Sequence, residues 1–275
     1  MDIFSYPFMQ NAFIAGSFVA ILAGTIGVFV VARNLSFIAQ TFSEIGFAGA
    51  SLSIFMGWEP MVGLLVFTTG SALAVSQLGL KNFQREEAIG VVFSFFMGLG
   101  LLFLSLSTRQ SNSAISLLFG SILGISSKQV WILLVLSIIV LLFLLLGYRF
   151  LVIDTFDPVG AEARGLPVRA ISLSFLLVLS MAVAGTIQIV GALLVFALMI
   201  TPAATARHLT NRLPVMIFLS AILSLAGVWI GLFLSYTVNW PVTFFITLIE
   251  TIFYFAAVYW KKYQTGRHLV KQTIK

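Results

Sequence analysis

The stretch that decides the fold is VWILLVLSIIVLLFLLLGYRF, residues 130–150, in which Arg149 is the only charged side chain. A run of about 20 apolar residues is long enough to cross the hydrocarbon layer of a membrane as a helix. Such runs recur along the chain, which is 60% hydrophobic and only 9% charged. A soluble domain has about 25% charged residues. The composition therefore predicts a membrane protein and excludes a soluble enzyme and a nucleic-acid binder.

The apolar runs predict an all-α, polytopic fold with about nine transmembrane helices. The expected spans are residues 11–32, 41–57, 60–80, 88–107, 130–150, 170–187, 188–206, 214–236 and 242–260. The long apolar stretch 170–206 is divided near Gly185, Thr186 and Gln188, because glycine and polar side chains favour a break. The segment 111–126 is rich in Ser and Gly and too short to span, which predicts an interfacial or re-entrant element.

The basic residues predict the orientation of the chain. Nine spans place the termini on opposite sides, and in one orientation only Arg109 and Lys128 of the 15 Lys and Arg residues lie outside. The other thirteen (15 minus 2) then face the cytoplasm, as the positive-inside rule requires. We expect the N-terminus outside and the C-terminus inside. Residues 1–260 then form one transmembrane domain, and residues 261–275 form a basic cytoplasmic tail against anionic lipid.

Several kinds of chemistry are absent from the sequence. The chain contains no Cys, which excludes disulfides and thiolate ligands. It contains no G-x-x-x-x-G-K-[ST] motif, so any ATP hydrolysis that drives it takes place on another chain. The expected spans contain neither His nor Cys, which argues against an intramembrane enzyme.

Two of the nine acidic residues, Glu44 and Glu250, fall inside expected spans. An ionisable group in hydrocarbon is costly, which makes each a functional candidate; the alternative is a position near a helix end or a protonated, hydrogen-bonded carboxyl. Gln40 lies one helical turn before Glu44, so the two share a face if the second helix starts early enough. Together they would then offer a carboxylate and an amide oxygen to a hard cation. Gln40 is equally well interpreted as a helix-start residue. Glu44 and Glu250 reach the same depth only if the second helix begins before residue 41.

The loop DTFDPVGAEARGLPVRA, residues 154–170, contains signals for a short cytoplasmic helix. Asp157 is a suitable N-cap, and Pro158 is favoured in the first turn. Gly165 and Pro167 end the helix. Such a helix can dock into a soluble partner or serve as a connecting elbow.

Four stretches, in this order, resemble the membrane permease subunit of the zinc/manganese/iron ABC importer family (the ABC-3 type). They are Gly27–Arg33 with Leu35–Ser36, Phe42–Glu44 and Ala48–Gly49; Glu87–Val91; Leu118–Leu123 with Phe156–Pro158, Ala161 and Gly165; and Gln188–Leu194 with Thr201–Arg207. The resemblance covers nearly the whole chain. It implies a multi-pass protein of a bacterial plasma membrane.

The resemblance also implies partners and site residues. The family's permease forms a homodimer, is driven by two cytoplasmic ABC ATPase subunits, and receives its ion from an extracytoplasmic solute-binding protein. The ATPase-coupling loop corresponds here to Asp157, Pro158, Ala161, Glu162 and Gly165. No cofactor is bound permanently; the divalent metal ion is the cargo, and ATP binds the partner subunit.

The chain departs from the family in the second span. The family usually has Asp-x-x-x-Ser-His, whereas this chain has Gln40 in place of the Asp and Glu44 in place of the His. Because zinc favours nitrogen and sulfur ligands and manganese accepts oxygen, the change slightly favours Mn²⁺ over Zn²⁺ or Fe²⁺. We expect a substrate path past Gln40, Ser43, Glu44 and Glu250, with Glu44 as the metal ligand. The alternatives are a permease for a non-metal substrate and a proton-coupled secondary transporter using Glu44 or Glu250.

Overall fold

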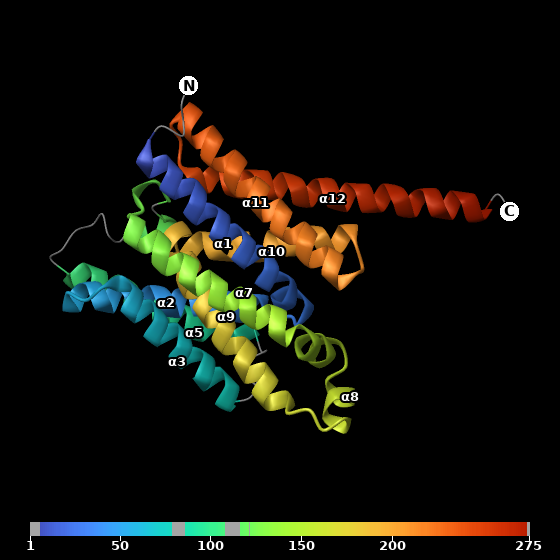
Figure 1. Ribbon diagram of the computed structural model, residues 1–275, viewed down its shortest axis with the longest axis horizontal. Coiled ribbons are helices and arrows are strands. Elements are labelled where there is room, and N and C mark those ends of the chain that lie inside the picture. The colour runs from blue at the N-terminus through green and yellow to red at the C-terminus, as the bar shows by residue number, and fades with distance from the viewer. Residues whose placement is uncertain (1–5, 79–85, 108–115, 121, 274–275) are drawn as a thin grey trace.

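The computed structural model describes residues 6–78, 86–107, 116–120 and 122–273, and its regular structure within these ranges is entirely helical (Figure 1). The elements are α1 (Pro7–Ala32), α2 (Ser36–Met56), α3 (Pro60–Leu78), α5 (Glu86–Leu106), the 3₁₀-helix η2 (Ile122–Gly124), α7 (Ser127–Phe156), α8 (Pro158–Ala163), α9 (Val168–Val190), α10 (Ala192–Leu209), α11 (Leu213–Val238) and α12 (Val242–Thr273). The prediction of an all-α fold is confirmed.

Eight helices in the described part of the chain are long and apolar enough to cross a membrane: α1, α3, α5, α7 and α9 to α12. The ninth long helix, α2, has 21 residues and contains both Gln40 and Glu44. Every residue of α2 from Thr41 to Ser51 is buried, because α3, α5, α9 and α10 pack around it. A helix enclosed by other helices does not need an apolar surface toward lipid. The expectation of about nine transmembrane helices therefore agrees with eight apolar helices and one enclosed helix.

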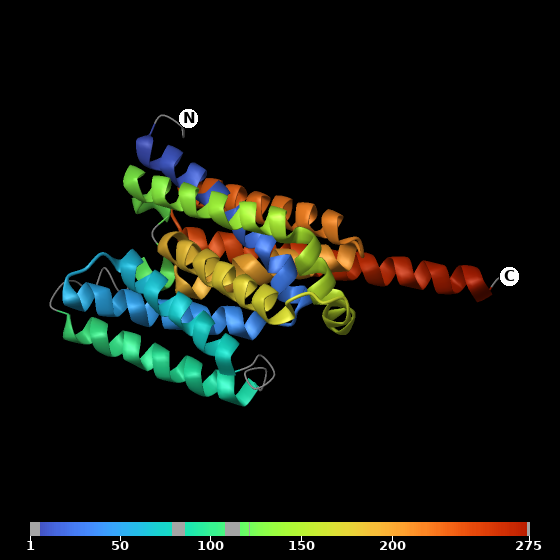
Figure 2. The same cartoon turned by 60° about the horizontal axis from the view of Figure 1, so that its bottom comes forward.

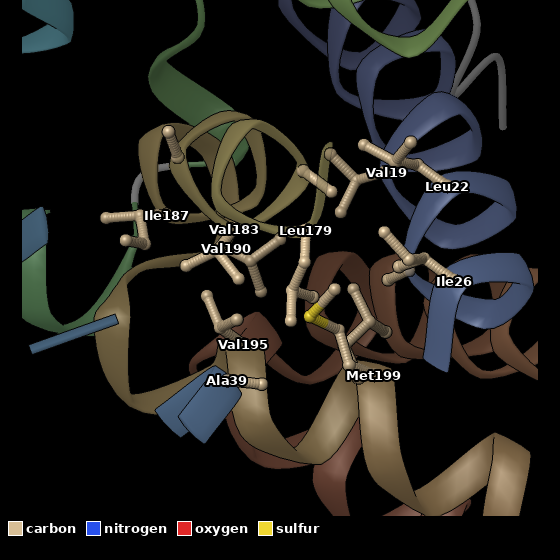
Figure 3. Close-up of a cluster of buried hydrophobic side chains, with 14 of the residues drawn as sticks. Val19, Leu22, Ile26, Ala39, Leu179, Val183, Ile187, Val190, Val195 and Met199 are labelled. Atoms are coloured by element: carbon tan, nitrogen blue, oxygen red, sulfur yellow. The ribbon is translucent and has the colours of Figure 1, made fainter. Parts of the chain in front are cut away.

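The helices form a bundle in which α9 and α10 lie between two groups (Figure 2). One group is α2, α3 and α5, and the other is α1, α7, α11 and α12. Side chains from α1, α9 and α10 meet in a buried apolar cluster together with Ala39 of α2 (Figure 3). The labelled members of this cluster are Val19, Leu22, Ile26, Leu179, Val183, Ile187, Val190, Val195 and Met199.

Glycines allow two pairs of helices in the bundle to approach closely. A Cβ atom on Gly27 of α1 would overlap the carbonyl oxygen of Met199 in α10. Gly49 of α2 and Gly63 of α3 face each other, and a Cβ atom on either would overlap the backbone of the other. Small residues at such contacts are typical of helix packing in membranes, where close backbone approach supplies van der Waals contact.

The break between α9 and α10 lies at Gly191, so the prediction of a break near Gly185, Thr186 and Gln188 is wrong by a few residues. Thr186 stays helical because its hydroxyl donates to the carbonyl of Ala182 at 2.8 Å within the same helix. Gly185 also stays helical and lies against the side chain of Leu136. Gly191 has a φ of +84°, a conformation that glycine adopts without the strain that a Cβ atom brings.

Two further expectations concern segments that the structure describes in part. Of residues 111–126, those at 116–119 form one helical turn followed by Gly120, and η2 follows. Gly120 packs against the backbone at Gly191; residues 111–115 and 121 lie outside the described residues.

At the C-terminus α12 continues to Thr273 and extends away from the bundle (Figure 1). The division at residue 260 therefore stays a prediction, with no break in the helix there.

Helices α1 and α7 run side by side in the same direction, which defines the two ends of the molecule. Near the start of both, Asn11 Nδ2 donates to the carbonyl of Ile125 at 3.4 Å. Near the end of both, Arg33 lies beside Asp154. Helix α8 follows α7 at this second end. The assignment of this end to the cytoplasm stays a prediction.

Candidate functional site

Gln40 and Glu44 form a polar pair inside α2, hereafter the Gln40–Glu44 pair. Helix α2 begins at Ser36, earlier than the predicted start at residue 41, so both residues lie within the helix and share one face. Gln40 Nε2 donates to Glu44 Oε1 at 3.2 Å. Glu44 has no exposed surface. The structure thus meets the condition on which the pairing of these residues depended.

The Gln40–Glu44 pair leaves two oxygen atoms without a hydrogen-bond donor. Gln40 Oε1 and Glu44 Oε2 are both buried and unpartnered. An unpaired buried acceptor costs about 1–3 kcal/mol, and more when it is charged. Two such oxygens on adjacent turns of one helix are suited to binding a hard cation, whose preferred ligands are carboxylate and carbonyl oxygens.

Ser43 lies next to the pair and connects α2 to the break between α9 and α10. Its buried hydroxyl donates to the carbonyl of Ala192, the first residue of α10, at 2.8 Å. This bond holds α2 against the turn between α9 and α10. Ser43 therefore positions the site, and its role in a substrate path remains a prediction.

Glu250, the other acidic residue in an expected span, is not hydrogen-bonded to the Gln40–Glu44 pair in the described structure. It is buried in α12 and packs against Gly227 of α11, where a Cβ atom would come 3.1 Å from Glu250 Cγ. Both of its carboxyl oxygens are buried and unpartnered. Although α2 begins before residue 41, no hydrogen bond in the described structure joins Glu250 to Glu44. Its place on a common path with Glu44 stays a prediction.

The donor set around Glu44 limits how it can hold a metal ion. Within the described residues, no group of three or more His, Cys, Asp or Glu side chains is placed to bind one metal. An ion at Glu44 therefore needs amide, hydroxyl or backbone oxygens, or water, to complete its shell. Such a set is weak and oxygen-rich, which suits passage of a hard ion better than permanent retention.

The short cytoplasmic helix that the sequence predicts is present as α8. Asp157 caps its start, since Asp157 Oδ1 accepts from the amide of Gly160 at 2.9 Å, and Pro158 is in the first turn. At its end Gly165 has a φ of +74°, and its amide donates to the carbonyl of Glu162. The amide of Leu166 donates to the carbonyl of Ala161, which completes a Schellman motif.

Helix α8 presents one buried and several exposed side chains. Ala161 is completely buried and anchors the helix, whereas Glu162 is exposed. The exposed surface includes two large apolar side chains, Val159 with 77% and Phe156 with 63% of its surface accessible. Phe156 is the last residue of α7, and Val159 lies in the first turn of α8. An exposed apolar pair at the start of a capped helix is typical of a surface that contacts another protein.

A network that the sequence analysis missed joins the end of α1 to α7 and α9, near the start of α8. Arg33, directly after α1, forms an ion pair with Asp154 of α7, with 2.9 Å between Nη2 and Oδ2. Arg33 Nε also donates to Thr155 Oγ1 at 2.9 Å. The guanidinium lies 4.6 Å from the ring centre of Phe175, and Ser172 Oγ donates to Asp154 Oδ2 at 3.1 Å. We call these five residues the Arg33–Asp154 network. The sequence signals this network only through two opposite charges, Arg33 and Asp154, which lie near the ends of two helices on the same expected side of the membrane.

Residues 5–261 match the ABC 3 transport family, which is far more than half of the chain. The chain belongs to the ABC 3 transport family. It is thus a multi-pass permease of the plasma membrane, a transport component of the ABC type.

Two relatives of similar length have names that specify manganese transport. The "Manganese transport system membrane protein MntC" of Listeria monocytogenes is 35% identical over 92% of this chain and 90% of its own length. The "Manganese import system permease protein ScaB" of Streptococcus parasanguinis is 30% identical over 90% of this chain and 89% of its own. Among solved structures, "PsaBC from Streptococcus pneumoniae in complex with Fab" matches with a TM-score of 0.84 at 30% identity, covering 92% of this chain and 91% of the other.

Proposed function

We propose that this permease forms the membrane pathway of an ATP-driven importer for Mn²⁺. The observation that supports it best is the Gln40–Glu44 pair, a buried carboxylate and a half-buried amide with two buried, unpartnered oxygens in α2. A manganese pathway is also consistent with relatives whose names specify manganese transport.

The chemistry of the pair favours Mn²⁺ over Zn²⁺. Carboxylate and amide oxygens suit hard divalent ions, whereas Zn²⁺ favours imidazole and thiolate ligands. Glu44 supplies one negative charge in the low-dielectric interior, which offsets part of the cost of removing water from a divalent ion. Gln40 orients that carboxylate through its hydrogen bond and offers its own oxygen. Because each ligand is weak, the ion can also leave, which a transport pathway requires.

Helix α8 is proposed as the contact for a separate ATPase subunit. The 275 residues contain no P-loop motif, so we place nucleotide binding on another chain. The coupling residues then have distinct roles: Asp157, Pro158 and Gly165 define the ends of α8, Ala161 anchors it, and Glu162 lies on its exposed surface. Val159 and Phe156 supply the apolar contact.

The remaining partners follow from the ABC architecture and are proposals as well. Two copies of the permease would pair, with one ATPase on each α8. A solute-binding protein would deliver the ion to the end of the molecule where α1 and α7 begin. The orientation with α8 in the cytoplasm places these two partners on opposite sides of the membrane.

Uptake by the assembled importer tests the proposal. The permease, its ATPase and its binding protein are reconstituted in liposomes and offered Mn²⁺, Zn²⁺ and Fe²⁺ separately, with and without ATP. We expect ATP-dependent uptake that is fastest for Mn²⁺. Uptake of none of the three ions by a complex that hydrolyses ATP would contradict the proposal and point to a non-metal substrate.

A single substitution tests the choice of ion. Glu44→His restores the imidazole that the family usually has at this position. Because imidazole is a better ligand for Zn²⁺ than for Mn²⁺, the ratio of Zn²⁺ to Mn²⁺ uptake should rise. An unchanged ratio would mean that Glu44 does not select the ion.

A further inference from the structure

A cavity lined by both polar and apolar side chains lies at the end of the molecule where α1 and α7 begin. It has a volume of about 330 Å³ and is enclosed by the α2–α3 loop, the start of α7, the end of α9 and residues near η2. Its lining includes Glu59, Leu64, Ser116, Ile125, Gln129 and Gln188. This volume exceeds that of a hydrated metal ion, and both charged and neutral oxygens line it.

Gln188 is the side chain in this cavity that has an unused ligand atom. Its Oε1 is buried and has no hydrogen-bond donor. The neighbouring Gln129 differs, because its Oε1 already accepts from the amide of Ser126 at 2.9 Å in the capping box of α7. An unpaired amide oxygen beside a polar cavity is stabilised when a water molecule or a cation binds there.

Glu59 gives the cavity a negative rim. Its side chain is 48% exposed, and its carboxylate lies 3.6 Å from Lys128 Nζ. That lysine is 74% exposed, and an ion pair between such exposed groups is weak. The Glu59 carboxylate therefore remains able to attract a cation from solution toward the cavity.

The inner side of the cavity lies near the segment of α2 that contains Glu44. Ile187, next to Gln188, packs against Gly46 of α2, two residues beyond Glu44. Ala192, four residues after Gln188, accepts the hydrogen bond from Ser43. Between them Gly191 lies against Gly120, with the two backbones in direct contact. Residues next to the cavity and residues next to the Gln40–Glu44 pair thus both contact the segment at the α9–α10 break.

We propose that this cavity holds the divalent cation before it reaches Glu44, with Gln188 Oε1 as a direct ligand and Glu59 attracting the ion to the rim. The inference rests on the proposed function and adds a second cation site to the same pathway. It gives the Gln188–Leu194 stretch a physical role: the glutamine binds the ion, and Gly191 allows the helix break and the close approach of Gly120.

Equilibrium binding of Mn²⁺ to the full-length permease tests this site. The protein is placed in nanodiscs of neutral lipid, and free Mn²⁺ is counted by electron paramagnetic resonance during a titration. We expect two ions per chain for the unmodified protein and one for Glu44→Gln. Gln188→Leu removes the ligand oxygen and should weaken the cavity site at least about tenfold, the effect of one lost polar contact of this kind.

Two further variants separate loss of a ligand from loss of structure. Gln188→Glu keeps the length and the oxygen, so it should retain two bound ions. Gln77→Leu makes the same chemical change as Gln188→Leu on an exposed position of α3 and should also retain two. Melting curves of all variants confirm that each is folded.

Three results would overturn the inference. In the first, Gln188→Leu binds the same number of ions as Gln77→Leu with the same affinity. In the second, the unmodified chain binds one ion that Glu44→Gln removes, which leaves the proposed function intact. In the third, the unmodified chain binds no Mn²⁺; the uptake experiment on the assembled importer then decides separately whether the proposed function fails too.

Discussion

The Gln40–Glu44 pair and the Arg33–Asp154 network are both buried and polar, but they differ in how completely their atoms are bonded. Glu44 has one hydrogen bond, and the pair leaves two buried oxygens unpartnered. None of the unpartnered buried atoms in the described structure belongs to Arg33 or Asp154. A fully bonded network fixes helices in place. A pair with unpartnered oxygens has capacity for a ligand, and we propose that the first region serves transport while the second holds the helices in place.

The largest expected effect on stability comes from breaking the Arg33–Asp154 network on one side. Asp154→Ala leaves the Arg33 guanidinium buried without its partner, and removal of one member of a buried ion pair costs about 3–5 kcal/mol. The free energy of unfolding of the purified permease, from denaturant titration, measures this loss. The double variant Arg33→Met with Asp154→Leu removes both charges and should recover most of it. An unchanged free energy in Asp154→Ala would show that the network does not stabilise the fold.

A smaller effect, on transport and not on folding, is expected at Gln40. Gln40→Leu removes the donor that orients Glu44 and one candidate ligand oxygen. Loss of one hydrogen bond to a charged group corresponds to about 1.5–3 kcal/mol, so Mn²⁺ uptake should fall by about tenfold or more at low ion concentration. The free energy of unfolding should change little. Gln77→Leu, with the same chemical change at an exposed position, is the matched control and should transport normally.

The smallest effect is expected at the edge of the Arg33–Asp154 network. Ser172→Ala removes one of the hydrogen bonds to Asp154, whose ion pair with Arg33 remains. The cost should be about 0.5–1.5 kcal/mol in the free energy of unfolding. Ser174→Ala is the control on the same helix, because the Ser174 hydroxyl is exposed and bonds within α9. Equal losses in the two variants would mean that the bond to Asp154 contributes nothing specific.

The helices and α8 were predictable from the sequence because each depends on local signals. Length and apolarity define the membrane helices. Asp157, Pro158 and Gly165 define α8 through capping and left-handed backbone geometry, which involve only residues within a few positions. The Gln40–Glu44 pair was predictable for the same reason, since both residues lie on one helix one turn apart.

The features that the sequence did not predict depend on contacts between distant residues. Glycine favours a helix break at both Gly185 and Gly191, but in the structure Gly185 lies against the Leu136 side chain and stays helical, whereas Gly191 lies against the backbone of Gly120 and ends α9. The Arg33–Asp154 ion pair joins residues more than a hundred positions apart. The unpartnered oxygen of Gln188 could likewise not be predicted, because the cavity beside it is lined by residues that are far apart in the sequence.

The most direct test of the central claim is Mn²⁺ uptake by the reconstituted importer carrying Glu44→Gln. The substitution keeps the size and the hydrogen bonding of the side chain and removes its charge. Uptake should fall to background, while the melting temperature and the assembly with the ATPase stay the same. Glu87→Gln, at an exposed position at the start of α5, is the control and should transport Mn²⁺ at the unmodified rate. Normal uptake by Glu44→Gln would contradict the assignment of this carboxylate to the cation path.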